Sequence, residues 1–334
     1  MGGGLRQEIV SVARTAYLKG LTAGWGGNIS AEQEDGTILI SPHKKSLGFI
    51  SEQDILTIDR EGNVLEGPGE PSMEKAMHCA LYRETEAKAV VHLHPPCINS
   101  LVSNDVPLQL DTFETRLMLG TSIPVLEQDT PITTDIAGLV NAFGTANLVF
   151  LKHHGVVAAG DDLFEAFALV DVAEEAAQLT INSMTIGKRR EGAAQNEPSK
   201  RAAEALPVFS IEHMKRIQKL VNEDEEAQKL GQRTNLTVRY AIKQLEDGKA
   251  FNIHFENGKI ADITNDEKAD FINAGKREIW IHVFNGRLDP FAATSQKKLR
   301  LQKGHIGDLA KWYAPFYRIF ALWKDAPVKE LDEE

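Results

Sequence analysis

Residues 72–96 read SMEKAMHCALYRETEAKAVVHLHPP, and the hydrophobic period changes within this stretch. From Ser72 to Arg83 the apolar residues recur at i, i+3, i+4, i+7 and i+8, which predicts a helix capped by Ser72. The expected buried stripe of this helix consists of Met73, Ala76, Met77, Ala80 and Leu81. Residues 89–94 form a short apolar run that stops at two prolines, which predicts a buried strand. The helical and strand-like periods thus stand side by side.

Further helical and strand-like patterns alternate on both sides of this stretch, up to about residue 187. Helices are expected over 5–19 and 163–186. Short apolar strands are expected over 37–41, 55–59, 148–152 and 156–159. Interleaved strands and helices predict an α/β fold in which helices cover both sides of a central sheet.

A change of composition separates this region from the rest of the chain. Residues 187–207, GKRREGAAQNEPSKRAAEALP, are charged or small and carry almost no large apolar side chain. Such a segment has little to bury, which is typical of a linker. The 334 residues are therefore expected to form a first domain over 1–190, a linker over 191–209 and a second domain over 210–328.

The region after the linker has its own elements. A helix is expected over 211–230, and the alternation in 251–256 before the turn Asn257-Gly258 predicts a hairpin. Ile279, Ile281 and Val283 alternate in the same way and also predict a strand, as does the segment 298–302. A cluster of aromatic residues follows between Trp312 and Trp323.

Composition excludes several classes of protein. The net charge of −11 disfavours a nucleic-acid binder, which needs a concentrated basic face. Cys79 and Cys97 are too few for a disulfide scaffold and indicate a reducing compartment. No apolar run reaches the roughly 18 to 20 residues of a membrane span, and the N-terminus lacks the apolar core of a secretory signal. A cytoplasmic location is expected.

Histidines carry the first chemical signal. His92 and His94 stand at i and i+2 of the predicted strand, so both side chains lie on one face with Cα atoms roughly 6.5 to 7 Å apart. This spacing allows both imidazoles to bind one metal ion of the zinc type, and a third protein ligand is then needed. Residues 153–155, His-His-Gly, offer two candidates at the end of another strand, and Glu74 could supply a carboxylate.

Six short motifs in order together resemble the class II aldolase/adducin family over about residues 5–187. They are Gly26-Gly27-Asn28-Ile29-Ser30, Ile40-Ser41-Pro42, Asp54-Ile55, Pro71-Ser72-Met73-Glu74, His92-Leu93-His94 and His153-His154-Gly155. The resemblance implies a three-layer α/β/α sandwich, commonly a cyclic tetramer with sites at subunit interfaces. It also implies that His92, His94 and His154 hold zinc or a similar divalent ion such as manganese or cobalt, with His153 as a neighbour.

The resemblance also implies roles around the metal. Glu74 matches the acid/base of the aldolases, and Gly26, Gly27 and Asn28 match the loop that holds the phosphate end of the substrate. Ser41 and Ser72 match hydroxyl positions of the same site. This chain departs from the pattern at Met73, which replaces a second hydroxyl, and at His43-Lys44, where Lys44 could supply a positive charge.

The aldolases also use tyrosines as proton donors, but this chain has no tyrosine between Pro107 and Pro124. Asp111, Glu114 and Arg116 are the candidates in that segment.

The resemblance indicates an enzyme that acts on a small carbonyl substrate, sugar-derived or a hydroxy or keto acid. A divalent metal stabilises the enediolate formed when a C–C bond breaks, so aldol cleavage is expected. The same site also suits epimerisation, dehydration or decarboxylation. A non-catalytic adducin-like protein and a lipid-linked carrier are the alternatives from other classes.

The segment from about Ile211 to Trp323 resembles the sterol-carrier-protein type of domain, on two motifs. These are residues 285–290, NGRLDP, and residues 298–304, KLRLQKG. The resemblance implies an α+β domain whose curved sheet and helices enclose an apolar cavity, and therefore an apolar ligand. The alternative is that the aromatic residues simply fill a core.

Overall fold

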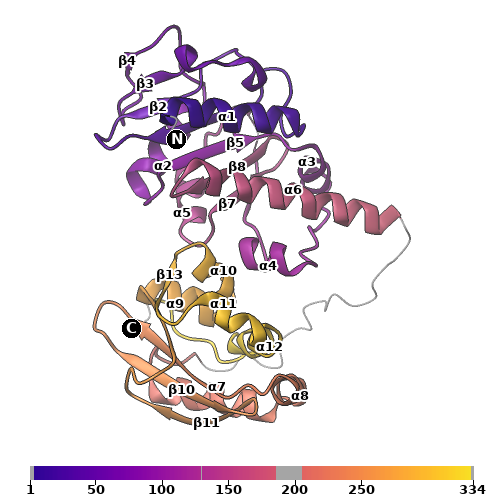
Figure 1. Cartoon of the computed structure of the whole chain (residues 1–334), viewed down its shortest axis with the longest axis vertical. Coiled ribbons are helices and arrows are strands. Elements are labelled where there is room, and N and C mark those ends of the chain that lie inside the picture. The colour runs from indigo at the N-terminus through magenta and orange to yellow at the C-terminus, as the bar shows by residue number, and fades with distance from the viewer. Residues whose placement is uncertain (1–3, 129, 186–204, 332–334) are drawn as a thin grey trace. The chain divides into compact units, whose positions relative to one another are not determined.

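The structure is a computed structural model that describes residues 4–128, 130–185 and 205–331. The chain divides into two compact units, residues 1–191 and 192–334 (Figure 1). Among the described residues, no helix is both long and apolar enough to cross a membrane.

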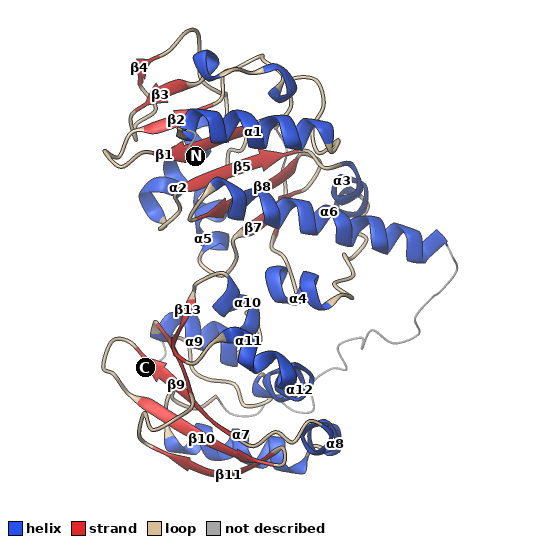
Figure 2. Cartoon of the chain, in the orientation of Figure 1, coloured by secondary structure: helices blue, strands red, loops and turns tan. Residues whose placement is uncertain are grey.

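The first unit is built on an eight-stranded sheet in the order β4-β3-β2-β1-β5-β8-β7-β6 (Figure 2). Its strands are β1 (Asn28–Glu32), β2 (Ile38–Ile40), β3 (Leu56–Ile58), β4 (Val64–Glu66), β5 (Ala89–Leu93), β6 (Val125–Leu126), β7 (Leu148–Leu151) and β8 (Gly155–Gly160). Neighbours pair antiparallel except β6 and β7, which pair parallel. β5 lies in the middle of the sheet, where both of its faces are covered.

Helices pack against both faces of this sheet. One hydrophobic core contains residues of α1 (Leu5–Leu18), α3 (Pro96–Ser103), α4 (Phe113–Leu119) and α6 (Leu163–Thr185). The other contains residues of α2 (Lys75–Glu84) and α5 (Ile136–Phe143). The strand β5 supplies Val91 to the first core and Val90 to the second, as alternation requires. The expected α/β/α arrangement is confirmed.

The start of α2 differs from its sequence prediction. Met73 is 59% exposed and Ala76 is exposed, although both belong to the expected stripe. The helix begins at Lys75, so the helical period does not extend back to Met73. Its buried face instead includes His78 and Tyr82 in addition to Met77, Ala80 and Leu81.

The second unit contains a five-stranded sheet in the order β11-β10-β9-β12-β13. Its elements are α7 (Ile211–Glu223), α8 (Glu225–Arg233), β9 (Val238–Gln244), β10 (Ala250–Glu256), β11 (Lys259–Thr264), β12 (Phe271–Gly275), α9 (Arg277–Phe284), α10 (Pro290–Ser295), β13 (Leu299–Lys303), α11 (Ile306–Leu309) and α12 (Tyr313–Trp323). The expected hairpin is present as β10 and β11, and its turn residues Asn257 and Gly258 have φ of 50° and 86°.

Two predictions in this unit are wrong. The segment with Ile279, Ile281 and Val283 is the helix α9, because its buried positions Trp280, Ile281, Val283 and Phe284 follow a helical spacing that the alternation concealed. The single helix expected over 211–230 is two helices, which meet at Asp224. The Asp224 carboxylate caps α8 by accepting from the Ala227 amide.

The expected linker lies mostly outside the described residues. Its last part does not behave as a linker: Leu206 pairs with Val328, and Phe209 is buried against Phe251, Trp280 and Phe284. These residues pack within the second unit, because Phe209 contributes a large apolar side chain to its core.

The aromatic residues near the C-terminus are packed against one another. Phe316, Phe320 and Trp323 are buried, and their rings contact Tyr240, Phe291 and Phe284 respectively. A cavity of about 10 Å³ remains beside them, near the minimum for one water molecule. In this structure the aromatic side chains therefore fill the core.

Candidate metal centre

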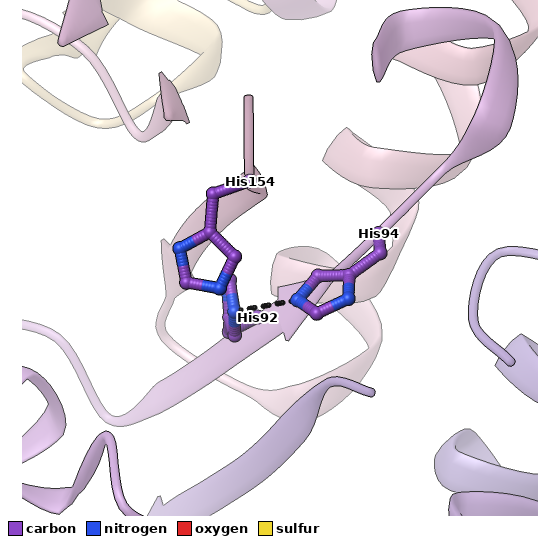
Figure 3. A group of neighbouring side chains, drawn as sticks. All are labelled: His92, His94 and His154. Atoms are coloured by element: carbon purple, nitrogen blue, oxygen red, sulfur yellow. Dashed lines mark hydrogen bonds between the residues drawn. The ribbon is translucent and has the colours of Figure 1, made fainter. Parts of the chain in front are cut away.

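Three histidines converge at one end of the central strands of the first unit (Figure 3). His92 lies on β5, His94 directly follows that strand, and His154 lies in the turn between β7 and β8. His94 Nε2 lies 3.0 Å from His92 Nε2. One nitrogen from each of the three rings lies within 4.8 Å of the other two. The structure thus brings together the three histidines matched by the family pattern.

Glycines make this approach sterically feasible. A Cβ on Gly155 would lie 2.3 Å from the Leu93 carbonyl oxygen and 2.6 Å from His94 Cδ2. A Cβ on Gly26 would lie 2.8 Å from His94 Nδ1. Gly27 has φ of 75°, which only glycine adopts at little cost. The glycine motifs are therefore part of the geometry of the histidine cluster.

The protonation of the histidines suits metal binding. His92 Nδ1 is 2.8 Å from the Val156 carbonyl and donates to it, which leaves the Nε2 lone pair directed at the cluster. Burial, together with His94 and His154, holds the pKa of His92 well below its usual range. Burial and His154 lower the pKa of His94 to about 4, and burial also lowers the pKa of His154. Neutral imidazoles are metal ligands.

A further observation supports a divalent metal as the ion bound by the three imidazoles. His154 Nδ1 is buried and has no hydrogen-bond partner among the described residues. Three neutral imidazoles with nitrogens within 4.8 Å of one another can direct lone pairs at one cation.

Glu74 lies beside the cluster but is more buried than the sequence indicated. Its position at the start of a helix predicts a carboxylate near the surface, but it is only 6% exposed. Its Oε1 is 3.9 Å from His154 Nε2, and the Thr133 amide donates to both carboxylate oxygens at 3.0 and 3.1 Å. Burial raises the pKa of Glu74, while the bonds from Thr133 act in the opposite direction. A covering segment that is distant in sequence causes the difference.

The other expected site residues differ in their surroundings. Asn28 lies directly opposite His92 in the register of β1 and β5. Ser41 Oγ accepts from the Ile29 amide, and Ser72 Oγ accepts from the Glu74 amide, so both hydroxyls border this region. Lys44 is exposed, with φ of 54°, and makes no ion pair or hydrogen bond with any described residue.

The segment proposed as a source of a proton donor contains α4. Its Arg116 donates from Nε to the Leu110 carbonyl, and the Arg116 guanidinium lies 3.9 Å from Asp111. Glu114 lies in the first turn of α4. These contacts stay within the segment and do not place the three candidates at the histidine cluster.

Sequence reasoning missed two kinds of residue. Thr133 acts through its backbone amide, which no side-chain pattern reveals. His78 and Tyr82 are buried on α2, and His78 contacts Asn28. The sequence did contain a signal for these two residues. His78 and Tyr82 lie four and eight residues after Glu74, a helical spacing that returns to about the same face.

Comparison with known families agrees with this architecture. Residues 7–181 match the family model described as the class II aldolase and adducin N-terminal domain. The chain belongs to this family. Residues 214–311 match the SCP-2 sterol transfer family, which confirms the second resemblance.

Individual relatives cover the first unit. The chain is 30% identical over 184 residues to an L-fuculose phosphate aldolase of Methanocaldococcus jannaschii, covering 55% of this chain and 99% of that protein. It is 32% identical over 183 residues to a 3-oxo-tetronate 4-phosphate decarboxylase of Haemophilus influenzae, covering 52% and 85%. The solved L-fuculose-1-phosphate aldolase of Thermus thermophilus is 28% identical, with a TM-score of 0.50, covering 57% and 98%.

Proposed function

We propose that this chain is a divalent-metal-dependent lyase that cleaves a C–C bond in a small phosphorylated carbonyl compound. The observation that carries the proposal is the convergence of three neutral imidazoles beside a buried carboxyl group, His154 Nε2 being 3.9 Å from Glu74 Oε1. A metal-ligand set next to a proton-transferring group is the minimum that such a reaction needs.

The roles follow from the donor atoms. His92, His94 and His154 would hold the metal, most suitably zinc, with manganese or cobalt as alternatives. The bound ion would supply a Lewis acid for substrate oxygens. Glu74 would transfer a proton through Oε1, because burial raises its pKa and its carboxyl is held by Thr133 rather than by a positively charged side chain. Gly26, Gly27 and Asn28, bordered by Ser41 and Ser72, would receive the anionic end of the substrate, and Lys44 could reach it from the exposed loop.

Aldol cleavage is the proposed reaction, because two of the three relatives above are aldolases by name. Decarboxylation is the second candidate, since another relative at similar identity is a decarboxylase. All three names carry a phosphate group on the substrate, so a phosphorylated substrate is part of the proposal.

The test is elemental analysis of the purified protein followed by a substrate screen. The screen compares L-fuculose 1-phosphate, 5-deoxy-D-ribulose 1-phosphate and 3-oxo-tetronate 4-phosphate with their unphosphorylated counterparts, and it measures aldehyde and carbon dioxide separately. Turnover that disappears with a chelator and returns with zinc supports the proposal. A metal-loaded protein that turns over none of the compounds would contradict it.

The assembly and the second unit complete the proposal. We propose a cytoplasmic location and a homo-oligomer, specifically the tetramer that the family resemblance implies. The first unit exposes large apolar side chains such as Trp25, Phe113 and Phe164, which supports self-association. Light scattering coupled to size-exclusion chromatography measures the assembly.

We also propose that residues 210–328 form a separate domain that binds an apolar ligand, on the basis of the SCP-2 match. Mass spectrometry of organic extracts of the native protein tests for such a ligand.

A further inference from the structure

A chain of hydrogen bonds connects α2 to β1 next to the metal centre. Tyr82 Oη is 2.6 Å from Ser30 Oγ, and Ser30 Oγ is 2.6 Å from His78 Nδ1. On the other side of the imidazole, His78 Nε2 is 2.5 Å from Asn28 Oδ1. All four residues are buried, with at most 6% exposure. This series of hydrogen bonds therefore ends at Asn28, the residue opposite His92 in the sheet.

Only one direction of donation satisfies every group in this chain. Burial lowers the pKa of His78 to about 3, so the ring is neutral and has one N–H donor and one acceptor nitrogen. Among the described residues, Ser30 Oγ is the only acceptor near the Tyr82 hydroxyl, because its other partner, the Val90 backbone amide, is a donor. If Ser30 donated to Tyr82, the buried Tyr82 proton would have no acceptor, which costs free energy.

The satisfied direction begins at Tyr82. Tyr82 donates to Ser30, Ser30 donates to His78 Nδ1, and His78 Nε2–H donates to Asn28 Oδ1. This order fixes the tautomer of His78. It also fixes the orientation of the Asn28 amide, whose oxygen faces α2.

The Asn28 amide nitrogen then points away from His78. It has no hydrogen-bond partner among the described residues, although it is a double donor on a nearly buried side chain. It follows Gly26 and Gly27, where an added Cβ would lie 2.8 Å from His94 Nδ1 and 2.8 Å from the His92 carbonyl oxygen, respectively. The free N–H groups therefore belong to the loop that borders the histidine cluster.

We propose that His78 is a positioning residue that holds the Asn28 amide with its NH2 group presented to an anionic oxygen of the substrate. An amide held in the opposite orientation would present its oxygen and repel the same anion. His78 thus selects for anionic substrates through Asn28 without touching them. The inference rests on the proposed function for the identity of the anion, a phosphate, but not for the direction of the hydrogen bonds.

The first test is the tautomer of His78 in the full-length protein. Long-range proton–nitrogen spectra of histidine-labelled protein, with the signal assigned by its loss in His78→Gln, should show the proton on Nε2. A proton on Nδ1, or a doubly protonated ring at pH 7, overturns the proposal.

The second test is binding of inorganic phosphate by isothermal titration calorimetry, at equal zinc content. His78→Leu removes the donor and should weaken phosphate binding about tenfold or more, the range for a hydrogen bond to a charged group. His78→Gln can donate to Asn28 from its amide and should restore most of the affinity. Asn28→Asp, which replaces the NH2 group by an oxygen, should weaken binding at least as much as His78→Leu. Cys79→Ala, also buried on α2, is the matched control and should bind like the parent.

The outcomes separate positioning from simple destabilisation. Equal losses in His78→Leu and His78→Gln, unchanged binding in Asn28→Asp, or a parent protein that does not bind phosphate would each overturn the proposal. If His78→Leu does not fold, the tautomer and the other two variants still decide. On an active substrate, His78→Leu should raise KM about tenfold and change kcat less than threefold. Phosphate binding without turnover of any sugar phosphate would instead contradict the proposed function alone.

Discussion

The Thr133 backbone amide donates to both carboxylate oxygens of Glu74, at 3.0 and 3.1 Å. Thr133 lies 59 residues after Glu74, so a distant segment holds the proposed acid/base in place. The bidentate contact keeps the carboxyl near His154, at 3.9 Å, without a positively charged partner. A neutral donor stabilises the carboxylate less than a guanidinium would, so the group can still take up a proton.

Replacing Glu74 by Gln should abolish proton transfer and preserve the metal. We expect turnover to fall about 100-fold or more, the usual range for a general acid–base group, with unchanged zinc content. Steady-state kinetics and elemental analysis on one preparation measure both. Glu70→Gln, an exposed glutamate of the preceding loop, is the matched control and should retain activity. Loss of metal with unchanged activity per bound ion would make Glu74 a ligand instead.

Replacing His92 by Ala should remove the metal, because the His92 ring lies 4.8 Å from each of the other two proposed ligands, centroid to centroid, and its Nε2 faces the cluster. Elemental analysis should fall from about one divalent ion per chain to near zero. His153→Ala is the matched control: His153 is exposed, has φ of 62° and is not part of the cluster. Metal content near one per chain in His92→Ala would show that the ligands are assigned incorrectly.

Gly155→Ala should disturb the metal centre from the backbone. The new Cβ would meet the Leu93 carbonyl at 2.3 Å and His94 Cδ2 at 2.6 Å. We expect the free energy of unfolding to fall by about 1–3 kcal/mol, as for an overpacked core, together with weaker zinc binding in a chelator competition. Gly4→Ala, where a Cβ meets no atom within 4 Å, should change neither quantity. Parent-like zinc affinity in Gly155→Ala would mean that His94 does not bind the metal.

The second unit should lose stability in mild acid because of His213. This ring is fully buried, its Nε2 donates to the Ala326 carbonyl at 3.0 Å, and burial lowers its pKa to about 4. The unfolded chain binds the proton near pH 6.5, so stability conferred by neutral His213 is complete above that pH and declines between pH 6.5 and 4. The expected loss is up to about 3 kcal/mol.

Urea unfolding of parent and His213→Gln between pH 7.5 and 4.5 measures this loss. The variant should be less stable than the parent at pH 7.5, and the difference should shrink as the pH falls. A difference that stays constant over this range would contradict the assignment.

A chain truncated at Gly192 should fold and retain the metal, since the whole eight-stranded sheet and the three histidines precede it. Differential scanning calorimetry should show one cooperative transition, and elemental analysis should give the metal content of the full chain. A truncated chain that aggregates or unfolds without a cooperative transition would show that the two units depend on each other for folding.

Local sequence pattern predicts most of the elements of the first unit. The local hydrophobic period indicates whether a segment is a helix or a strand, and the apolar run with Val90 and Val91 before His92 and His94 predicts a strand. The i, i+2 spacing also put these two side chains on one face, because alternation is a property of any strand. The proposed third ligand, His154, was distinguished from His153 only by the family pattern.

Local pattern was insufficient where two periods were compatible with the same residues. Residues 279–283 alternate as a strand does, but Trp280 and Phe284 complete a helical face, and packing of Trp280 with Phe209 and Phe284 selected the helix. Phe209 was assigned to the linker by its neighbours, and only the second unit's core shows why it is ordered.

The environment of the proposed catalytic groups depends on contacts that form only in the folded chain. The burial of Glu74 depends on Thr133, and the orientation of Asn28 depends on His78, 50 residues away in the sequence. Burial and the direction of a hydrogen bond are properties of contacts between distant segments. The identity of a residue and its near neighbours does not contain them, whereas the spacing of two histidines on one strand does.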